Sequence, residues 1–289
     1  MGHNFVIVTD SACDIAPEIL EQWGVGAAHL KYRFDGEDRD YFNGEISSAE
    51  FYEKMRGGAS AKTAAVNGEQ FKDLLRPALE RGEDVLYLGF SSGLSGTYQS
   101  GVIAAEEMRE EFPDRKILTV DTLCASAGQG LLVRLALDKK NEGASIEETA
   151  SFVENRRLNL CHWFTVDDLT YLKRGGRISP AVAFVGGMLG IKPVLHVDDE
   201  GHLISVSKVR GRKAALEALA NRYVELAEEP GKGPVYISHA DCMDDIEQLK
   251  NMLRDKTGAE VELVADVGAV IGSHSGPGTV ALFFLGKNR

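Results

Sequence analysis

Two glycine-rich segments hold the side chains best suited to chemistry. The first is Gly89-Phe-Ser-Ser-Gly-Leu-Ser-Gly-Thr97, and the second is Ile271-Gly-Ser-His-Ser-Gly-Pro-Gly278. Serine hydroxyls and an imidazole can act as nucleophile and base in acyl transfer. The same groups can also donate hydrogen bonds to an anion without any reaction. The sequence therefore offers two interpretations of these segments, a hydrolase and a binding site.

The hydrolase interpretation rests on Gly89-Phe-Ser-Ser-Gly93, which matches the G-x-S-x-G pattern of a nucleophilic serine. With Ser91 as nucleophile and His274 as base, an esterase-like order of Ser, Asp and His needs an aspartate between them. The candidates are Asp167, Asp168, Asp241 and Asp266. Two features count against this reading. The next helix is predicted to start near Ser95 rather than directly after Ser91, and no H-G-G-G-type oxyanion segment precedes the motif.

The binding interpretation uses the start of that next helix. Ser95 is a natural N-cap for a helix predicted at residues 97–112, and free N–H groups at a helix start can hold an anion. The glycines around His274 allow close approach of a ligand or of a neighbouring strand. A serine that only caps its helix and a purely structural histidine are the simpler alternatives, and both stay open at this point.

Other polar segments add weaker signals. Thr63 lies in a predicted loop, residues 62–67, where it could cap, bind or face solvent. Leu172-Lys-Arg-Gly-Gly-Arg-Ile-Ser179 is one basic cluster in a chain of formal net charge -12. A second basic cluster contains Lys208, Arg210, Arg212 and Lys213. Each cluster fits either a solvated helix end or a site for an anion or acidic partner, and the exposed arginines between glycines favour the latter.

The elements that carry these segments alternate between strand and helix in the first half of the chain. Strands are predicted at residues 5–9, 27–32, 85–88 and 116–120, with helices at 15–23, 67–81, 97–112 and 126–140. This order is typical of a mostly parallel sheet covered by helices on both faces. Ligands of such sheets bind at the carboxyl ends of the strands, where Ser11 and Ser92 also lie.

The second half has a different order. Predicted strands at residues 191–197 and 203–209 are separated by the short loop Asp198-Asp-Glu-Gly201, so they form an antiparallel hairpin. Further strands are predicted at 162–166, 235–238, 261–264 and 279–285. We therefore expect two domains: an N-terminal α/β domain at 1–157 with a mostly parallel sheet, and a C-terminal α+β domain at 158–289 with a largely antiparallel sheet.

Several classes of function have little support. The acidic charge disfavours nucleic acid as a partner, and no apolar run approaches the roughly 20 residues that span a bilayer. No secretory signal pattern opens the sequence. The four cysteines form no C-x-x-C pair, which predicts reduced thiols and a cytoplasmic location. Nucleotide-binding and zinc-binding motifs are missing too, so we expect no cofactor and no metal.

Several segments jointly resemble the DegV family of bacterial fatty-acid-binding proteins, also called FakB. The segments are Ile7-Val-Thr-Asp-Ser11, Ser91-Ser-Gly-Leu-Ser-Gly-Thr-Tyr-Gln-Ser100, Val120-Asp-Thr122 with Gly128-Gln-Gly130, Asp168-Leu-Thr-Tyr-Leu-Lys-Arg-Gly-Gly-Arg-Ile-Ser179, Gly190-Ile-Lys-Pro193 and Gly272-Ser-His-Ser-Gly-Pro-Gly278. The resemblance implies a lipid carrier without a reaction of its own. It also implies one long-chain fatty acid, such as palmitate or stearate, in a buried pocket.

The resemblance also implies roles for residues. Thr63, Ser95 with Gly96, and His274 would bind the fatty-acid carboxylate, while Ser11 and Ser92 would lie in the pocket wall or directly behind it.

A fatty acid kinase would be the partner, making an acyl-phosphate, with Arg174 and Arg177 contacting the partner or the phosphate. Transient membrane contact is compatible with this role. The chain departs from the family at Thr63-Ala-Ala-Val-Asn67, where the family commonly has Thr-Ser-Gln-Pro-Ser.

Overall fold

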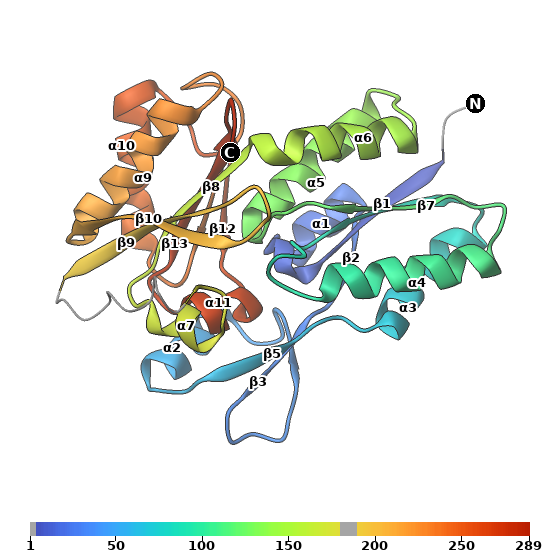
Figure 1. Ribbon diagram of the computed structural model, residues 1–289, viewed down its shortest axis with the longest axis horizontal. Helices are drawn as coiled ribbons and strands as arrows, with labels where there is room; N and C mark the ends of the chain where they lie inside the picture. The colour runs from blue at the N-terminus through green and yellow to red at the C-terminus, as the bar shows by residue number, and fades with distance from the viewer. Residues whose placement is uncertain (1–3, 180–189) are drawn as a thin grey trace.

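The computed structural model describes residues 4–179 and 190–289, whose strands form three sheets (Figure 1). Sheet A has the order β2-β1-β6-β7, sheet B the order β4-β3-β5, and sheet C the order β10-β9-β8-β13-β11-β12. The strands are β1 (Phe5–Asp10), β2 (Gly26–Ala28), β3 (Lys31–Phe34), β4 (Tyr41–Phe42), β5 (Ala61–Ala64), β6 (Asp84–Gly89), β7 (Ile117–Asp121), β8 (Leu160–Thr165), β9 (Ile191–Val197), β10 (Leu203–Arg210), β11 (Val235–His239), β12 (Leu263–Asp266) and β13 (Val280–Leu285).

The α-helices of the described residues lie mostly between these strands in sequence. They are α1 (Pro17–Trp23), α2 (Ser48–Arg56), α3 (Gly68–Glu80), α4 (Thr97–Glu111), α5 (Ser126–Asn141), α6 (Ile146–Arg156), α7 (Thr170–Arg174), α9 (Arg212–Leu226), α10 (Met243–Thr257) and α11 (Ala269–Ser275).

Sheet A is parallel throughout, as the alternation of strands and helices predicts. Successive side chains of a strand point to opposite faces. Leu86 and Leu88 of β6 accordingly join the core formed with α5, whereas Val85 and Tyr87 join the core formed with α3 and α4. Figure 1 shows α5 and α6 on one face of this sheet and α3 and α4 on the other. Both faces are therefore buried, and the carboxyl ends of the strands are free to position a site.

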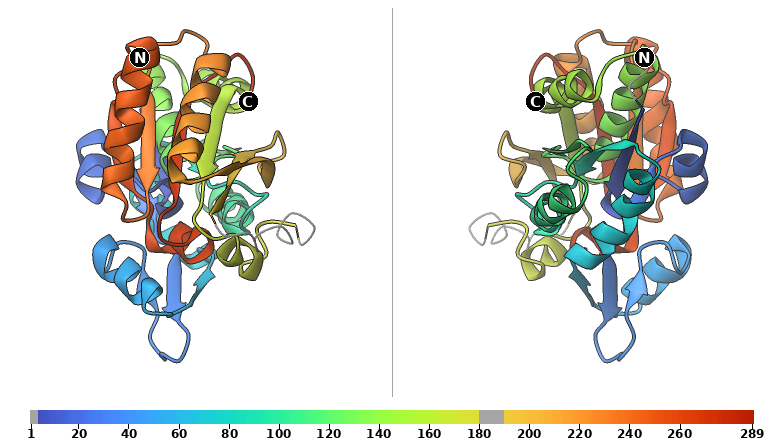
Figure 2. Two further views of the ribbon diagram at one scale, coloured as in Figure 1. Left: turned by 90° about the vertical axis from the view of Figure 1, so that its left-hand side faces the viewer. Right: turned by 90° about the vertical axis from the view of Figure 1, so that its right-hand side faces the viewer.

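One strand prediction is wrong. Residues 27–32 do not form a single strand, because the chain leaves sheet A after Ala28 and enters sheet B at Lys31. The turn between them is held by Leu30, whose N–H donates to Ser11 Oγ at 3.0 Å. In sheet B, β3 pairs antiparallel with β5, which places Thr63 opposite Tyr32. Figure 2 shows this small lobe projecting from the two larger sheets.

Sheet C is largely antiparallel, as predicted, and only the pair β11–β12 is parallel. The predicted hairpin is confirmed: β9 and β10 pair antiparallel, with a register shift between Ser205 and Ser207. Helices α9 and α10 pack on one face of sheet C through a separate apolar cluster that includes Leu216 and Leu249. Helix α5 shares the core of sheet A and residues of sheet C such as Phe283. It therefore lies between the two large sheets.

In the described ranges, 4–179 and 190–289, no helix combines the length and the apolar character needed to cross a membrane. The same part of the chain contains no group of three or more His, Cys, Asp or Glu side chains placed to hold a metal ion.

Candidate binding site

A mainly apolar cavity lies where the three sheets meet. It encloses about 990 Å³ of empty space, including the part open to solvent. Its lining comes from segments throughout the chain: Leu30, Thr63, Ala64, Ala65, Phe90, Leu94, Ser95, Gly96, Ala125, Ser126, His162, Phe164, Leu172, Arg177, Val197, Leu203, Val267, Val270, Ile271, His274, Ser275, Thr279, Ala281 and Phe283. An apolar cavity with a few convergent polar groups is the usual form of a small-molecule site.

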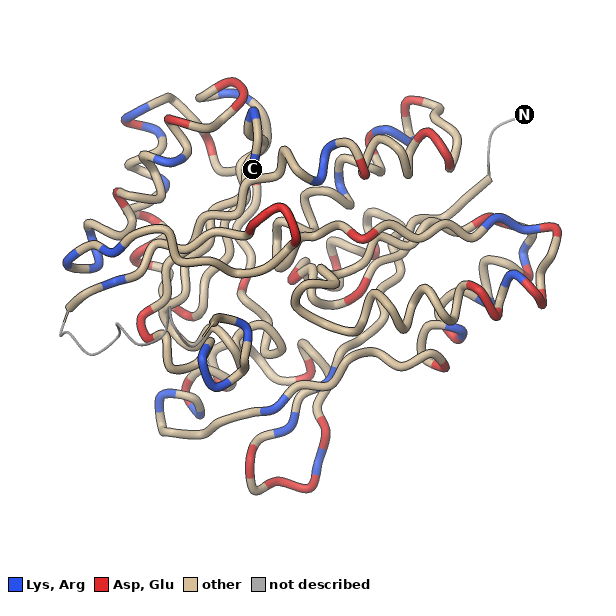
Figure 3. Tube along the Cα trace, viewed as in Figure 1, with Lys and Arg blue, Asp and Glu red and all other residues tan. Residues whose placement is uncertain are grey.

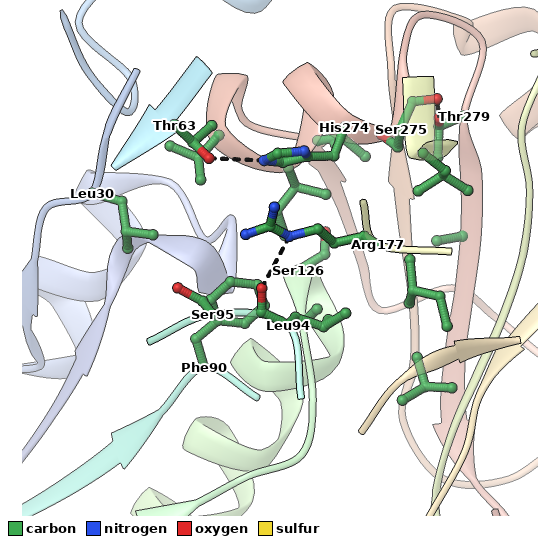
Figure 4. Close-up of a pocket in the computed structure, with 18 of the residues that line it drawn as sticks. Leu30, Thr63, Phe90, Leu94, Ser95, Ser126, Arg177, His274, Ser275 and Thr279 are labelled. Atoms are coloured by element: carbon green, nitrogen blue, oxygen red, sulfur yellow. Dashed lines mark hydrogen bonds between the residues drawn. The ribbon is translucent and has the colours of Figure 1, made fainter. Parts of the chain in front are cut away.

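The structure brings Thr63 and His274 together, although 211 residues separate them. Thr63 Oγ1 and His274 Nε2 form a hydrogen bond of 2.8 Å at the cavity wall (Figure 4). Both residues lie in other elements than predicted. Thr63 belongs to strand β5 rather than to a loop, and His274 belongs to helix α11 rather than to a loop before a strand. Each side chain is therefore held by regular backbone structure.

The imidazole of His274 is neutral near pH 7. Burial, followed by the positive charges of Arg177 and Arg174, lowers the pKa of His274 to about 4. Its Nδ1 is buried and has no hydrogen-bond partner among the described residues. A proton on Nδ1 would leave a buried N–H unpaired, so we place the proton on Nε2, from which it donates to Thr63 Oγ1. The Thr63 hydroxyl is then free to donate its own proton into the cavity.

Gly175 explains why His274 holds this position. A Cβ on Gly175 would lie 2.1 Å from His274 Nδ1, so the glycine backbone is in direct contact with the ring. A Cβ on Gly276 would similarly lie 2.4 Å from the ring of Tyr171. These contacts pack α7 against α11. The glycines of the basic cluster thus serve to fit the histidine as well as to expose arginines.

Ser95 lies at the cavity but is not the N-cap of α4. The helix begins at Thr97 and its N-cap is Gly96, which forms no side-chain cap. The Ser95 hydroxyl instead accepts from Thr97 N at 3.2 Å and contacts Thr97 Oγ1 at 2.9 Å. It therefore turns toward the first residue of the helix, and both Ser95 and Gly96 line the cavity. An anion there would face the N-terminal end of a fifteen-residue helix.

A buried carboxylate, to which no motif had assigned a role, supports this loop. Asp10 Oδ2 accepts from Phe90 N at 2.9 Å and from the Tyr87 hydroxyl at 2.8 Å, while its other oxygen accepts from Ala12 N at 3.2 Å. Desolvation raises the pKa of Asp10 above its ordinary value. The available signal was the polar group Thr-Asp-Ser directly after the first strand.

The two arginines of the first basic cluster have different positions. Arg177 lines the cavity, and its Nε donates to Leu94 O at 3.1 Å. Figure 4 shows its guanidinium between the Thr63–His274 pair and Ser95. Arg174 is exposed and lies over the ring of Tyr171, with 5.1 Å between the guanidinium carbon and the ring centroid. Only Arg177 is therefore placed to meet a head group inside the cavity.

The remaining predicted positions lie outside the cavity lining. Ser11 is behind the wall, where its hydroxyl fixes the backbone of the lining residue Leu30. Ser92 is exposed, and its backbone N–H donates to Asp121 at 3.2 Å. In the second basic cluster, Arg212 forms ion pairs with Asp245 at 2.8 Å and Asp167 at 3.4 Å. Figure 3 shows basic residues along α7 and on the β9–β10 side of the molecule.

The geometry contradicts the hydrolase alternative. The Ser91 side chain is fully buried, and its Oγ donates to Gly201 O at 2.9 Å and accepts from Gly93 N at 3.2 Å. His274 is bonded to Thr63 instead. In the part of the chain that the structure describes, Ser91 Oγ therefore bonds to backbone groups rather than to a base, and Ser91 does not line the cavity. The segment therefore has the G-x-S-x-G sequence without the geometry of a nucleophilic serine.

Two further polar residues that the motifs did not reveal, His162 and Ser126, also line the cavity. His162 is buried, and burial holds its pKa well below the ordinary value. Its Nδ1 lies 3.2 Å from Leu160 O, and its Nε2 accepts from Ala125 N at 3.4 Å. Ser126 Oγ bonds to Asp14 at 2.6 Å and to Ser238 at 2.8 Å. Since these polar atoms are paired within the protein, they do not need a polar partner from a ligand.

Comparison with known proteins gives one consistent family. The model of the DegV family, described as an uncharacterised protein family, matches residues 4–287. A DegV domain-containing protein of Clostridium perfringens is 42% identical over 286 residues, which cover 99% of this chain and 98% of that protein.

Two solved structures share the fold. A DegV family protein from Thermus thermophilus, described by its fatty acid binding, is 34% identical, with a TM-score of 0.88 and coverage of 98% of this chain and 99% of that one. A stearic-acid-binding protein from Eubacterium ventriosum is 27% identical, with a TM-score of 0.88 and coverage of 98% of both chains. The expected α/β fold, with a mostly parallel sheet in the N-terminal part and a largely antiparallel sheet in the C-terminal part, is thereby confirmed.

Proposed function

This chain belongs to the DegV family, and we propose that it binds one long-chain fatty acid in the cavity and carries it without a reaction of its own. The observation that carries the proposal is the Thr63–His274 pair, which faces Arg177 and Ser95 at one side of an apolar cavity. Solved relatives with 34% and 27% identity are described as binding fatty acid and stearic acid.

The chemistry of the cavity supports a carboxylate head group. A carboxylate taken out of water needs several hydrogen-bond donors to offset its lost hydration. In the proposed complex, the hydroxyls of Thr63 and Ser95 and the N–H groups near Gly96 donate to it, and Arg177 balances its charge. His274 acts through Thr63, because its Nε2 proton is already used there. It is therefore a positioning residue rather than a direct ligand.

The acyl chain would supply most of the affinity. Burial of a methylene group contributes about 0.8 kcal/mol, so a chain of about 16 carbons gives roughly 10 kcal/mol before the entropy costs of binding. Palmitate and stearate have acyl chains of about this length. The apolar side chains of Phe90, Phe164 and Phe283 would then contact the chain.

We further propose a fatty acid kinase as the partner, with a cytoplasmic location for the encounter. Four free cysteines support a reducing compartment.

The different positions of Arg174 and Arg177 lead us to propose different roles for them. Arg177→Ala should weaken lipid retention. Arg174→Ala should leave lipid retention unchanged and slow acyl-phosphate formation by the cognate kinase. Unchanged acyl-phosphate formation with both arginines replaced by alanine would rule out this role.

Mass spectrometry of the purified protein tests the central proposal, first under native conditions and then after solvent extraction. We expect one fatty acid per chain. Thr63→Val and Ser95→Ala should lower the occupancy while the protein stays folded. Ser92→Ala is the matched control on the same loop, because Ser92 is exposed outside the cavity. Equal occupancy in all variants would contradict the assigned head-group site, and an empty parent protein would contradict lipid carriage.

A further inference from the structure

The buried Ser91 joins two walls of the cavity. Its Oγ donates to the carbonyl of Gly201, in the turn between β9 and β10, at 2.9 Å. The same oxygen accepts from Gly93 N at 3.2 Å, within its own loop. Leu94, Ser95 and Gly96 follow in that loop and line the cavity. One hydroxyl thus connects the loop that carries part of the head-group site to a hairpin of sheet C.

Two glycines let the backbones of the loop and the turn touch. A Cβ on Gly93 would lie 2.8 Å from the carbonyl oxygen of Glu200. A Cβ on Gly201, whose φ is +80°, would lie 2.1 Å from Ser91 Oγ. No side chain fits at either position, so the contact depends on glycine on both sides.

Arg289 fixes the same turn from a second direction. Its Nη1 donates to Asp198 O and to Leu123 O, both at 2.9 Å, and its Nε donates to Leu160 O at 3.1 Å. Asp198 starts the β9–β10 turn, which appears as a red loop near the centre of Figure 3. Leu123 follows β7 in sheet A. The guanidinium therefore bridges backbone groups on both sides of the same junction.

The hairpin has a short backbone ladder to the rest of sheet C, although buried side chains such as Val194 and Leu195 anchor β9 in the core. Strand β10 is the edge of the sheet, and among the described residues β9 pairs with β8 at Trp163–His196 and Phe164–Leu195. Val197 and Leu203, which flank the turn, line the cavity. Release of the turn would let the end of the hairpin next to Val197 and Leu203 move while the buried part of β9 stays packed, and this movement would open the wall.

We propose that Ser91, Gly93, Gly201 and Arg289 form a clasp that holds the β9–β10 hairpin against the 91–96 loop and sets the rate of ligand exchange. This inference rests on the proposed function, because the exchanging ligand is a fatty acid. The hydrolase-like serine then acts as a positioning residue, and its partner is a backbone carbonyl rather than a base.

The first test compares Ser91→Ala with Ser92→Ala. Each delipidated protein is loaded with the fluorescent fatty acid cis-parinaric acid, and its release is followed by stopped flow after addition of excess stearate. Loss of one hydrogen bond at the clasp should speed release in Ser91→Ala by roughly 2- to 10-fold. Ser92→Ala should release at the parental rate. Arg289→Gln, which shortens the bridging side chain, should also release faster and is the second variant if Ser91→Ala does not fold.

Hydrogen exchange of the ligand-free proteins gives a readout that does not depend on binding. The backbone amides of residues 198–203 should exchange faster in Ser91→Ala and Arg289→Gln than in the parent, whereas amides of β1 should not change. Failure of the parent to bind cis-parinaric acid would refute the proposed function, and the exchange of these amides would still test the clasp. The inference would be overturned if the amides of residues 198–203 exchanged in both variants as slowly as in the parent. It would also be overturned if these amides exchanged faster while the fatty acid was released at the rate of the parent.

Discussion

Gly175→Ala should disrupt the head-group site although it adds only one methyl group. The backbone of Gly175 has φ of -72° and ψ of -11°, which alanine adopts without strain. The added Cβ would nevertheless lie 2.1 Å from His274 Nδ1, whereas ordinary contacts begin at 3.4 Å. The ring or the backbone must therefore move by more than an ångström. The 2.8 Å bond between Thr63 and His274 cannot survive a shift of that size in its present geometry.

The magnitude follows from the bonds at stake. A neutral hydrogen bond contributes about 1 kcal/mol net, and a bond from the Thr63 hydroxyl to a carboxylate contributes about 1.5 to 3 kcal/mol when well aligned. Loss of the first and weakening of the second give a total of about 1 to 3 kcal/mol. The dissociation constant for stearate should rise by roughly 5- to 150-fold.

Calorimetric titration of delipidated protein with stearate measures this change. Gly68→Ala is the matched control, because a Cβ there meets nothing within 4 Å. Thr63→Val and the double variant complete a cycle. Both single changes break the same bond. The loss of binding free energy in the double variant should therefore be smaller than the sum of the losses in the two single variants. Parental affinity for stearate in Gly175→Ala, or additive effects of the two changes, would show that Gly175 does not act through the Thr63–His274 bond.

Three predictions concern stability, each measured by urea unfolding. The pKa of His274 falls from 6.5 to about 4 on folding, so the unfolded chain binds more protons than the folded chain between these pH values. The parent should therefore lose stability as the pH falls through this window, and His274→Gln should lack that part of the loss. Burial raises the pKa of Asp14 from 3.8 to about 7, so stability should fall as pH rises through this window; Asp14→Asn should gain on the parent between pH 4 and pH 8. Asn67 and Gln70 form a reciprocal capping box at α3, and Asn67→Ala should cost about 1 kcal/mol, whereas an unchanged midpoint would show that the cap is dispensable.

Features with a local signal could be predicted from the sequence. Apolar runs bounded by turns located β1 and β6, and the short loop Asp198–Gly201 located the β9–β10 hairpin. The capping box at Asn67 also has a local signal, because Asn67 and Gln70 lie within one helical turn. The division into domains at residue 157 stays a prediction, although sheet C begins three residues later, at Leu160.

Features set by distant contacts could not be predicted. Helix α11 contains one glycine and two serines among its seven residues, which do not favour a helix, yet Gly272 packs against the hydroxyl of Tyr52 and the following Gly276 against Tyr171. These contacts hold a helix that local preference alone does not favour. Thr63 and His274 likewise have no local relation. Their association was expected only from the family resemblance, and the roles of these residues in binding stay predictions.

Ser91 illustrates the opposite error, a local match without the required geometry. The G-x-S-x-G pattern describes glycines around a nucleophilic serine on a tight turn. In this protein Ser91 and Gly93 of the pattern instead belong to the proposed clasp. Gly93 and Gly201 are needed for backbone contact, and the serine donates to a carbonyl. A nucleophilic serine needs an adjacent base, and a local sequence pattern does not show whether the fold places a base beside it.

The neutral state of His274 divides the work at the head group between two kinds of residue. Burial and the nearby arginines keep the imidazole uncharged, so it cannot balance the charge of a carboxylate. It can still fix the direction of the Thr63 hydroxyl, because its Nε2 proton occupies one lone pair of that oxygen. In the proposed complex, Arg177, inside the same cavity, would supply the positive charge. Orientation would then come from the neutral pair and charge compensation from the arginine, so Thr63→Val and Arg177→Ala should each weaken binding by a different physical route.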